Sequence, residues 1–387
     1  MTNGSGLCIA ACAVLVACSG ANPSDVGFGS ATGSDTSGGS GSSTGSTSSG
    51  AGSSTSSSSS SGGGTTTGGG SSGTGTSSGA GTSSGTGASS GVSVDAGGTT
   101  PDTTIYAHTD DTLYTLDPMT MTPTEVGAFA GLGGGDGDTA VTDLAVDGKG
   151  DVYVNSETVL YQVALPTGGT GTVNITRVAK LGGGASFYAL AYAPVGALDD
   201  AEEALVGGDS KGTLWSIDAA TGDAFALGDF GPDPVEDGNV LGLSGDVVFY
   251  TSTNGAPLGL ATIRSCPPKG GTCGKDYLAS IDMAAIKTAY STKTAATSLL
   301  GGVYGSPAAG QLGNGTGFYG VYGLGAWNAQ VFGFTRNRAS LGPQLITIDT
   351  TTGAGTAAAP PFAFTNGWSG AGVTTKVAII IRPPMIP

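Results

Sequence analysis

The sequence has few of the residues on which common catalytic and nucleic-acid-binding sites depend. Its 387 residues include a single histidine, His108, and 13 lysines and arginines against 29 acidic residues. A serine or cysteine nucleophile would have only this imidazole as its histidine base, and no strand–turn–helix elbow is visible. Zinc-binding spacings, phosphate-binding loops and dinucleotide fingerprints are absent as well. A net charge of −16 is the opposite of the basic face that phosphate groups require. We therefore expect no nucleic-acid partner, and we expect His108 to be a surface residue.

The apolar run at the N-terminus is too short to span a bilayer as a permanent helix. Residues 7–17 (LCIAACAVLVA) instead fit the core of a signal peptide. The segment Leu15-Val16-Ala17-Cys18 resembles the lipobox of bacterial lipoproteins, although residues 1–6 lack the usual positive charge. The resemblance implies that residues 1–17 are removed and that Cys18 carries lipid. Ser19 in the next position implies an outer-membrane destination. An ordinary secretory signal with a chance cysteine is the alternative.

A tether follows the cysteine. Residues 18–100 consist almost entirely of Ser, Gly and Thr after Cys18. Such a segment cannot bury enough apolar surface to offset the entropy of ordering it, so we predict that it is disordered. For about 82 residues the root-mean-square span is roughly 50 Å. The tether would hold a globular domain, residues 101–387, clear of the membrane.

The rest of the chain has an all-β pattern with an internal repeat. Short runs rich in Val, Ile, Tyr, Phe and Thr alternate with turns rich in Gly, Asp and Asn. One strand–turn–strand unit is Leu214-Trp215-Ser216-Ile217-Asp218, followed by Thr221-Gly222. Five variants of this unit occur, and they begin at Leu113, Leu160, Leu214, Leu278 and Leu345. No stretch has sustained helical periodicity; the best candidate, residues 277–300, also fits a turn between strands.

The repeat predicts a β-propeller. A run of small and apolar residues precedes most hairpins, which gives units of four short strands over roughly 45 to 65 residues. The pattern resembles bacterial propellers whose blades carry an LYxID…TG hairpin, as in quinoprotein-like repeats, and it covers residues 104 to about 380. Residues 104–107 lack a preceding inner strand, and residues 368–373 supply one without a hairpin. Pairing of the two ends would close a propeller with five blades. Six blades, two packed β-sandwiches or an open solenoid are the alternatives.

Two groups of residues are candidates for a local site. Cys266 and Cys273 enclose a short loop, and an exported protein meets oxidising conditions, so we predict a disulfide. Asp147 and Asp151 lie in a Gly-rich turn and are weak candidates for Ca²⁺, although ordinary turn chemistry explains them as well. We expect no other cofactor.

A further set of aspartates recurs at the end of the repeat unit. Because a repeating position is more often structural than catalytic, we expect these side chains to bond the backbone of the following turn. The set is Asp117, Asp218, Asp282 and Asp349.

The whole pattern resembles surface lipoproteins of large-genome Gram-negative bacteria such as myxobacteria. The resemblance implies an outer-membrane lipoprotein that faces the periplasm or the cell exterior. The main hypothesis is a non-enzymatic binding or scaffold module, with an envelope protein or a glycan as partner and a ligand site at the top or in the central channel. The alternative is a glycan-active enzyme that uses two carboxylates in the central channel, about 5 to 10 Å apart.

Overall fold

The computed structural model describes residues 104–379, apart from residues 134–136, 253, 309–310, 329, 337–341, 359–361, 363–366 and 377. The predicted signal peptide (1–17), Cys18 and the tether (18–100) lie outside the described residues. Within them the chain forms 21 strands and one helix, so the all-β prediction is confirmed.

Most strands form antiparallel groups of four, and we call each group a blade. The first blade contains β20 (Gly370–Val373), β1 (Ile105–His108), β2 (Thr112–Asp117) and β3 (Thr122–Ala130). The second contains β4 (Asp143–Val146), β5 (Val152–Asn155), β6 (Val159–Ala164) and β7 (Val173–Lys180). The third contains β8 (Phe187–Ala193), β9 (Ala204–Asp209), β10 (Leu214–Ile217) and β11 (Ala224–Gly228). The fourth contains β12 (Val240–Ser252), β13 (Pro257–Cys266), β14 (Asp276–Ile281) and β15 (Leu300–Val303). The fifth contains β16 (Val321–Trp327), β17 (Gln330–Thr335), β18 (Leu345–Ile348) and β19 (Gly355–Ala357).

Two short parallel pairings connect strands that are distant in sequence. Phe129 of β3 pairs with Val173 of β7, which joins the first two blades at their outer strands. The last strand, β21 (Ala378–Ile379), pairs with the end of β12.

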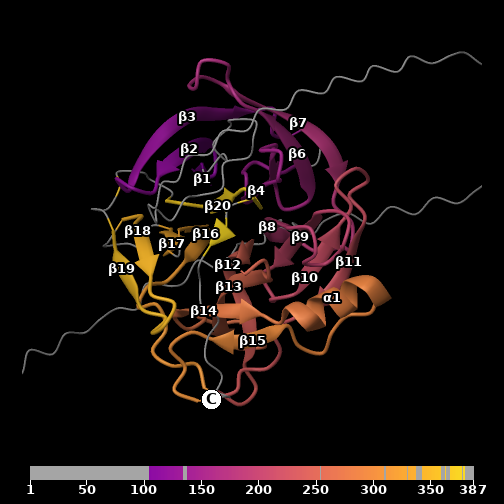
Figure 1. Cartoon of the computed structure of the whole chain (residues 1–387), viewed down its shortest axis with the longest axis vertical. Helices are drawn as coiled ribbons and strands as arrows, with labels where there is room; N and C mark the ends of the chain where they lie inside the picture. Colours follow the sequence, from indigo (N-terminus) through magenta and orange to yellow (C-terminus); the bar gives the residue numbers. More distant parts are fainter. Residues whose placement is uncertain are drawn as a thin grey trace, which may run out of the picture. The chain divides into compact units, whose positions relative to one another are not determined.

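The blades are arranged around a ring of inner strands. The inner strands β4, β8, β12, β16 and β20 each contact the next, and β20 contacts β4 in turn (Figure 1). Antiparallel pairing of β1 with β20, from Ile105 opposite Val373 to His108 opposite Gly370, confirms the predicted closure by the two ends. The fold is therefore a β-propeller. Five blades occur among the described residues, and the blade number of the whole chain stays a prediction.

Small residues allow the inner strands to approach one another. A Cβ added to Gly245 would lie 2.2 Å from the Cα of Tyr322 on the neighbouring inner strand. A Cβ on Gly370 would lie 2.1 Å from Oδ1 of Asp143 and 2.4 Å from Nε2 of His108. Glycine is needed here because the backbones are too close for any side chain.

The helix α1 (Met283–Thr292) lies within residues 277–300, the stretch that the sequence left open between a helix and a turn. The side chain of Asp282 caps it by accepting hydrogen bonds from the N–H groups of Ala284 and Ala285. Only Ile286 and Ala289 of this helix are buried, so the sequence carries little apolar periodicity to predict it. Within the described part of the chain, no helix is long and apolar enough to cross a membrane.

Candidate functional site

The repeated aspartates are structural, as predicted. Oδ1 of Asp218 accepts hydrogen bonds from the N–H groups of Ala220 at 2.8 Å and Thr221 at 3.1 Å. These donors hold the pKa of Asp218 below its ordinary value. The N–H group two residues further on also donates to the carboxylate at the other positions of the set, which are Asp117, Asp282 and Asp349.

The calcium candidates lie in the turn between β4 and β5. Oδ1 of Asp147 accepts from the N–H groups of Lys149 at 2.8 Å and Asp151 at 2.9 Å. Oδ1 of Asp209 bonds its own turn in the same way, and there Thr213 stands where the first turn has Asp151. The turn therefore accounts for Asp147 without a cation. Among the residues that the structure describes, no cluster of three or more His, Cys, Asp or Glu side chains could hold a metal ion.

Two carboxyl groups converge on the propeller axis, and both are fully buried. Asp143 on β4 and Asp246 on β12 share a side-chain hydrogen bond. Asp246 accepts at both oxygens, from the N–H groups of Val247 and Leu324, each at 2.6 Å. Asp143 accepts at Oδ2 from the N–H group of Leu190 at 2.7 Å. These bonds connect inner strands of the second, third, fourth and fifth blades.

The two carboxyl groups differ in which one holds a proton. Burial raises the pKa of both Asp143 and Asp246 well above the ordinary value, and the charge of Asp246 raises that of Asp143 further. Oδ1 of Asp143 has no hydrogen-bond partner among the described residues. A proton on the carboxyl group of Asp143 lets that group donate to the carboxylate of Asp246, which accepts backbone N–H groups at both oxygens. The geometry therefore assigns the proton to Asp143 and the negative charge to Asp246.

His108 belongs to this cluster, so the expectation of a surface residue is wrong. Its side chain is fully buried, with Nδ1 2.7 Å from the carbonyl oxygen of Thr109 and Nε2 3.9 Å from Oδ1 of Asp143. Since a carbonyl oxygen only accepts, Nδ1 carries the proton of the neutral ring. Burial lowers the pKa of His108 to about 4. The imidazole is therefore neutral at pH 7 and cannot neutralise Asp246.

Among the described residues, the cavity between the inner strands is too small for a ligand. The cavity there has a volume of about 10 Å³ and is lined by apolar residues of the inner strands, among them Leu144, Leu190, Val247 and Val373. About one water molecule needs that much space. Glycosidases hold their two carboxyl groups roughly 5 Å or more apart with a sugar between them, whereas Asp143 and Asp246 are hydrogen-bonded to each other. The axis does not supply the geometry of the glycan-active alternative.

A much larger cavity lies among the loops of the fourth blade, and we call it the disulfide-loop cavity. Its volume is about 790 Å³. The walls come from three connections: β11 to β12, β13 to β14, and β15 to β16. Because successive strands run in opposite directions, these three connections emerge on the same face of the propeller. The lining groups that the argument below uses are Asp233, Glu236, Asn239, Ser265, Thr272 and Tyr277.

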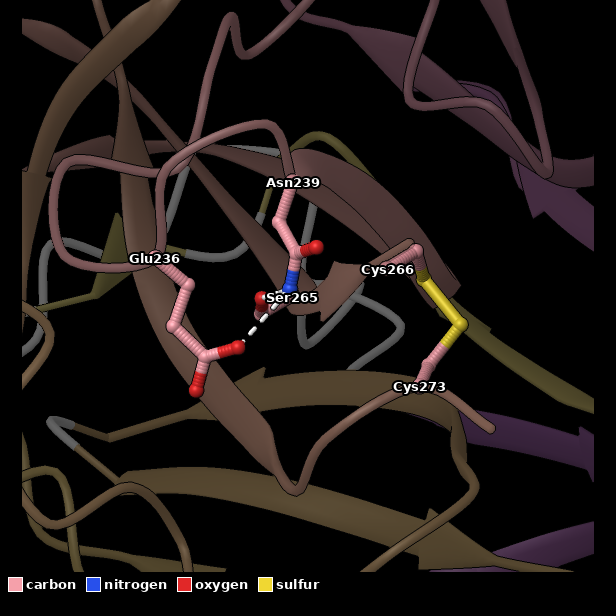
Figure 2. The surroundings of a disulfide bond; sticks show 5 residues. All are labelled: Glu236, Asn239, Ser265, Cys266 and Cys273. Carbon is pink, nitrogen blue, oxygen red and sulfur yellow. Dashed lines mark hydrogen bonds between the residues drawn. A yellow bond between two sulfur atoms is a disulfide. The ribbon is translucent and has the colours of Figure 1, made fainter. Parts of the chain in front are cut away.

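The connection between β13 and β14 is closed by the two cysteines. The structure joins Cys266 and Cys273 by a disulfide (Figure 2). Its formation in the cell stays a prediction. Beside it, Nδ2 of Asn239 donates to Oε2 of Glu236 at 2.9 Å and to Oγ of Ser265 at 2.8 Å (Figure 2). The bond to Ser265 ties the β11–β12 connection to the end of β13, and the bond to Glu236 braces that connection internally.

Asp233 is the most constrained polar group of the cavity. Its side chain is 7% exposed, and Oδ1 accepts from the N–H groups of Val235 at 2.7 Å and Glu236 at 3.2 Å. Oδ2 is buried and has no hydrogen-bond partner among the described residues. Buried polar atoms are rarely left unpaired, because the desolvation cost is about 1–3 kcal/mol and larger for a charged group. Asp233 is therefore an acceptor that lacks a donor.

The cavity is electrically negative. Among the described residues, no lysine, arginine or histidine lines it, whereas Asp233 and Glu236 both do. Burial, and then the charges of these two carboxylates, raises the pKa of Tyr277. The phenol consequently stays protonated and can donate or accept a hydrogen bond. Anionic ligands are disfavoured by the same charges.

A second cavity, of about 580 Å³, lies on the opposite face. It is lined by Phe225, Tyr290 and Lys293, together with several acidic residues. The ammonium group of Lys293 lies 4.0 Å from the ring centroid of Phe225 and 4.3 Å from that of Tyr290. A cation of the protein itself thus already occupies the aromatic faces of this cavity.

Sequence reasoning missed the buried polar residues of both the axis and the disulfide-loop cavity. None of Asp143, Asp246 and Asp233 was singled out from the sequence. Asp143 and Asp246 do share one signal, since a charged residue in a run of small and apolar inner-strand residues is unusual. No comparable signal marks Asp233, which lies in a loop.

The fold and the cavity together define a class: a β-propeller with a closed, polar axis and a ligand-sized cavity between loops on one face. No protein-family model and no curated protein matches the sequence.

Solved structures with some likeness include a protein of unknown function from Bacteroides caccae, with 10% identity and a TM-score of 0.33 over 70% of this chain and 98% of that one. The Dos1 propeller has 12% identity and a TM-score of 0.30 over 70% of this chain and 56% of that one. Virginiamycin B lyase from Staphylococcus aureus has 9% identity and a TM-score of 0.28 over 66% of this chain and 64% of that one. The assignment to the propeller class rests on the strand topology.

Proposed function

We propose that the chain is a lipid-anchored envelope protein whose propeller binds a small ligand in the disulfide-loop cavity without chemical turnover. One observation carries the binding role. The cavity, at about 790 Å³, is within the range of roughly 300–1,000 Å³ typical of small-molecule sites.

The non-enzymatic role is supported by the axis. Catalysis by paired carboxyl groups needs them within reach of a substrate. Asp143 and Asp246 are 0% exposed and are engaged with each other and with backbone N–H groups. Of the two places first expected for a ligand site, the top of the propeller and the central channel, we therefore prefer loops on one face, at the fourth blade, to the channel.

The location of the protein is supported by the sequence. A lipobox that ends at Cys18, followed by Ser19 and a long tether, is the pattern of an outer-membrane lipoprotein. Labelled palmitate should be incorporated into the full chain, and Cys18→Ser should abolish incorporation. Cys12→Ser is the matched control, because Cys12 lies in the part that the lipobox implies is removed. Equal labelling of wild type and Cys18→Ser would refute lipid attachment at Cys18.

The binding role can be tested with a mixed set of small fragments: polyols, amines, carboxylates and apolar rings. Ligand-detected NMR on the full-length protein should find binders. Thr272→Trp, an exposed lining position, should block them by filling the cavity, whereas Thr170→Trp, an exposed position in the β6–β7 connection, should not. If no fragment responds to Thr272→Trp, the cavity is not a binding site.

A further inference from the structure

The second cavity, on the other face of the propeller, already holds a cation of the protein itself. We call it the Lys293 cavity, and its volume is about 580 Å³. Helix α1 of the fourth blade lies beside β11 of the third blade (Figure 1), and these elements contribute Tyr290 and Phe225 to the lining. The two ring centroids are 6.0 Å apart, and the ammonium group of Lys293 lies 4.0 Å from the first ring, that of Phe225, and 4.3 Å from the second. The pair therefore forms two aromatic walls beside a position for a positive charge.

The charge of the lining also favours a cation. Burial, and then nearby carboxylates, raises the pKa of Tyr290, so the field at this phenol is negative. Such a field attracts cations and disfavours anions. The lining has one ammonium group, that of Lys293, against four carboxylates, which are Glu202, Glu203, Asp218 and Asp223.

The position over the two rings selects the kind of cation. Among the residues that the structure describes, Nζ of Lys293 has no hydrogen-bond acceptor and no ion-pair partner. A primary amine at this position would present three N–H donors for which the protein offers no acceptor. An alkylated ammonium group has no such donors to satisfy, and aromatic faces bind it through its charge and its methyl surface.

A metal ion fits poorly, because it needs several free oxygen ligands. Two of the four carboxylates are already engaged by the chain. Asp218 accepts hydrogen bonds from its own turn. Glu203 accepts from the N–H group of Gly148 and from the hydroxyl group of Thr375. These carboxylates contribute charge to the cavity rather than free ligands.

We propose that the Lys293 cavity binds a small organic cation with an alkylated ammonium group, which displaces the side chain of Lys293 from Phe225 and Tyr290. Lys293 is then a built-in competitor. Its backbone has the left-handed conformation (φ 54°, ψ 34°), and its N–H group donates to the carbonyl oxygen of Ala289 at the end of α1. Gly or Asn is usual at such a helix end. Because the side chain of Lys293 is exposed, it can leave the rings without opening the core.

The walls of the Lys293 cavity are tied together before a ligand arrives. Nζ of Lys287 on α1 donates to the carbonyl oxygen of Gly196 at 3.1 Å and pairs with Asp200, and both partners lie in the β8–β9 connection. The same connection supplies Glu202 and Glu203 to the lining. Walls that are fixed before binding lose less entropy when the ligand binds. The disulfide-loop cavity lies on the opposite face, so either site can fail its test without the other.

The test uses the full-length protein in a maltoside detergent, which has no ammonium head group. Choline is the probe, and 3,3-dimethylbutan-1-ol is its neutral analogue, with a tert-butyl group in place of the trimethylammonium group. Titration by saturation-transfer NMR at constant ionic strength gives a Kd for each. Choline should bind at least about tenfold more tightly than the neutral analogue, because the rings and the carboxylates act on its charge.

The variants separate the rings from the competitor. Lys293→Gly should tighten choline binding about tenfold, since it frees the two rings and suits the left-handed backbone. Lys149→Ala, which removes an exposed charge outside the cavity, is the matched control and should leave the Kd within about twofold. Phe225→Leu should weaken binding about tenfold or more, whereas Tyr290→Phe, which keeps the ring, should change it less than about twofold. Tyr290→Leu repeats the loss of a ring at a partly exposed position, in case Phe225→Leu does not fold.

Three results would overturn the inference. The first is that choline binds neither wild type nor Lys293→Gly. The second is that the neutral analogue binds as tightly as choline, or that removal of either ring leaves the Kd of choline unchanged, since the rings then do not recognise the charge. The third is an unchanged Kd in Lys293→Gly, which would show that Lys293 does not compete with the ligand.

Discussion

The assignment of the axial proton predicts that two similar substitutions have very different effects. Asp143→Asn places an amide where the protonated carboxyl group lies. The amide oxygen can still accept from the N–H group of Leu190, and the amide NH₂ can donate to the carboxylate of Asp246. We therefore expect Asp143→Asn to lie within about 1 kcal/mol of wild type in its free energy of unfolding.

In Asp246→Asn, no orientation of the new amide keeps every hydrogen bond of the original carboxylate. Both oxygens of Asp246 accept from backbone N–H groups, those of Val247 and Leu324. An amide keeps only one acceptor oxygen, so its NH₂ group must face an N–H donor. One charge-assisted bond, worth about 1.5–3 kcal/mol, is lost, and one buried donor stays unpaired. We expect a destabilisation of about 3 kcal/mol.

Urea unfolding of the full-length protein at pH 7, followed by near-ultraviolet circular dichroism, measures both effects. With a slope near 3 kcal/mol/M, Asp246→Asn should lower the midpoint by about 1 M, and Asp143→Asn by about 0.3 M or less. Asp237→Asn, at an exposed position, serves as the control for loss of a surface charge. If Asp143→Asn destabilises as much as Asp246→Asn, the proton is not on Asp143 and the assignment is wrong.

Three further predictions concern the axis and the helix. The pKa of His108 falls from 6.5 to about 4 on folding. The neutral imidazole therefore adds to the unfolding free energy above pH 6.5, and this stabilisation is lost as the pH falls. Relative to His108→Gln, wild type should lose about 3 kcal/mol of unfolding free energy between pH 7 and 4. Gly370→Ala should prevent closure and lower the melting temperature by more than 10 °C, whereas Gly168→Ala, in open space, should change it by less than about 2 °C. Asp282→Ala removes the cap of α1 and should cost about 1 kcal/mol in urea unfolding, with Asp282→Ser recovering most of it.

The carboxyl pair has a pH dependence of opposite sign. Burial raises the pKa of Asp143 and Asp246 on folding. Their contribution to the unfolding free energy is therefore fully present below their pKa in the unfolded chain, about 4, and is lost as the pH rises through their pKa values in the folded protein. Asp143→Asn needs no proton at this position. Its unfolding free energy should therefore fall less than that of wild type as the pH is raised from 5 to 9, and an identical slope for the two proteins would contradict a shared proton.

The parts of the fold that the sequence predicts are those with local patterns. The repeat units that begin at Leu113 and Leu214 open with strands β2 and β10 of the structure. The apolar run before the second hairpin, residues 142–147, contains inner strand β4. Closure was predictable because residues 104–107 lack an inner strand and residues 368–373 supply one. The helix α1 was missed because its buried face has only Ile286 and Ala289.

The candidate sites were less predictable, because they depend on residues from different blades and loops. Asp143 and Asp246 meet only when the inner strands form a ring, and no periodicity along the chain signals that meeting. Burial of His108 depends on the same closure, since its neighbour Gly370 comes from the other end of the domain. The disulfide-loop cavity was partly signalled, as Cys266 and Cys273 mark one of its three walls.

The separation of axis and cavity has a physical reason. Glycines in the inner strands, such as Gly245 and Gly323, let neighbouring strands approach closely, and the cavity between the described inner strands has a volume of only about 10 Å³. The same crowding buries polar groups, and hydrogen bonds from backbone N–H groups then make them part of the structure rather than available for binding. Loops at the rim escape this crowding, but they lose entropy when a ligand orders them. A short disulfide loop and the Asn239–Ser265 bond reduce that loss at one place, the fourth blade.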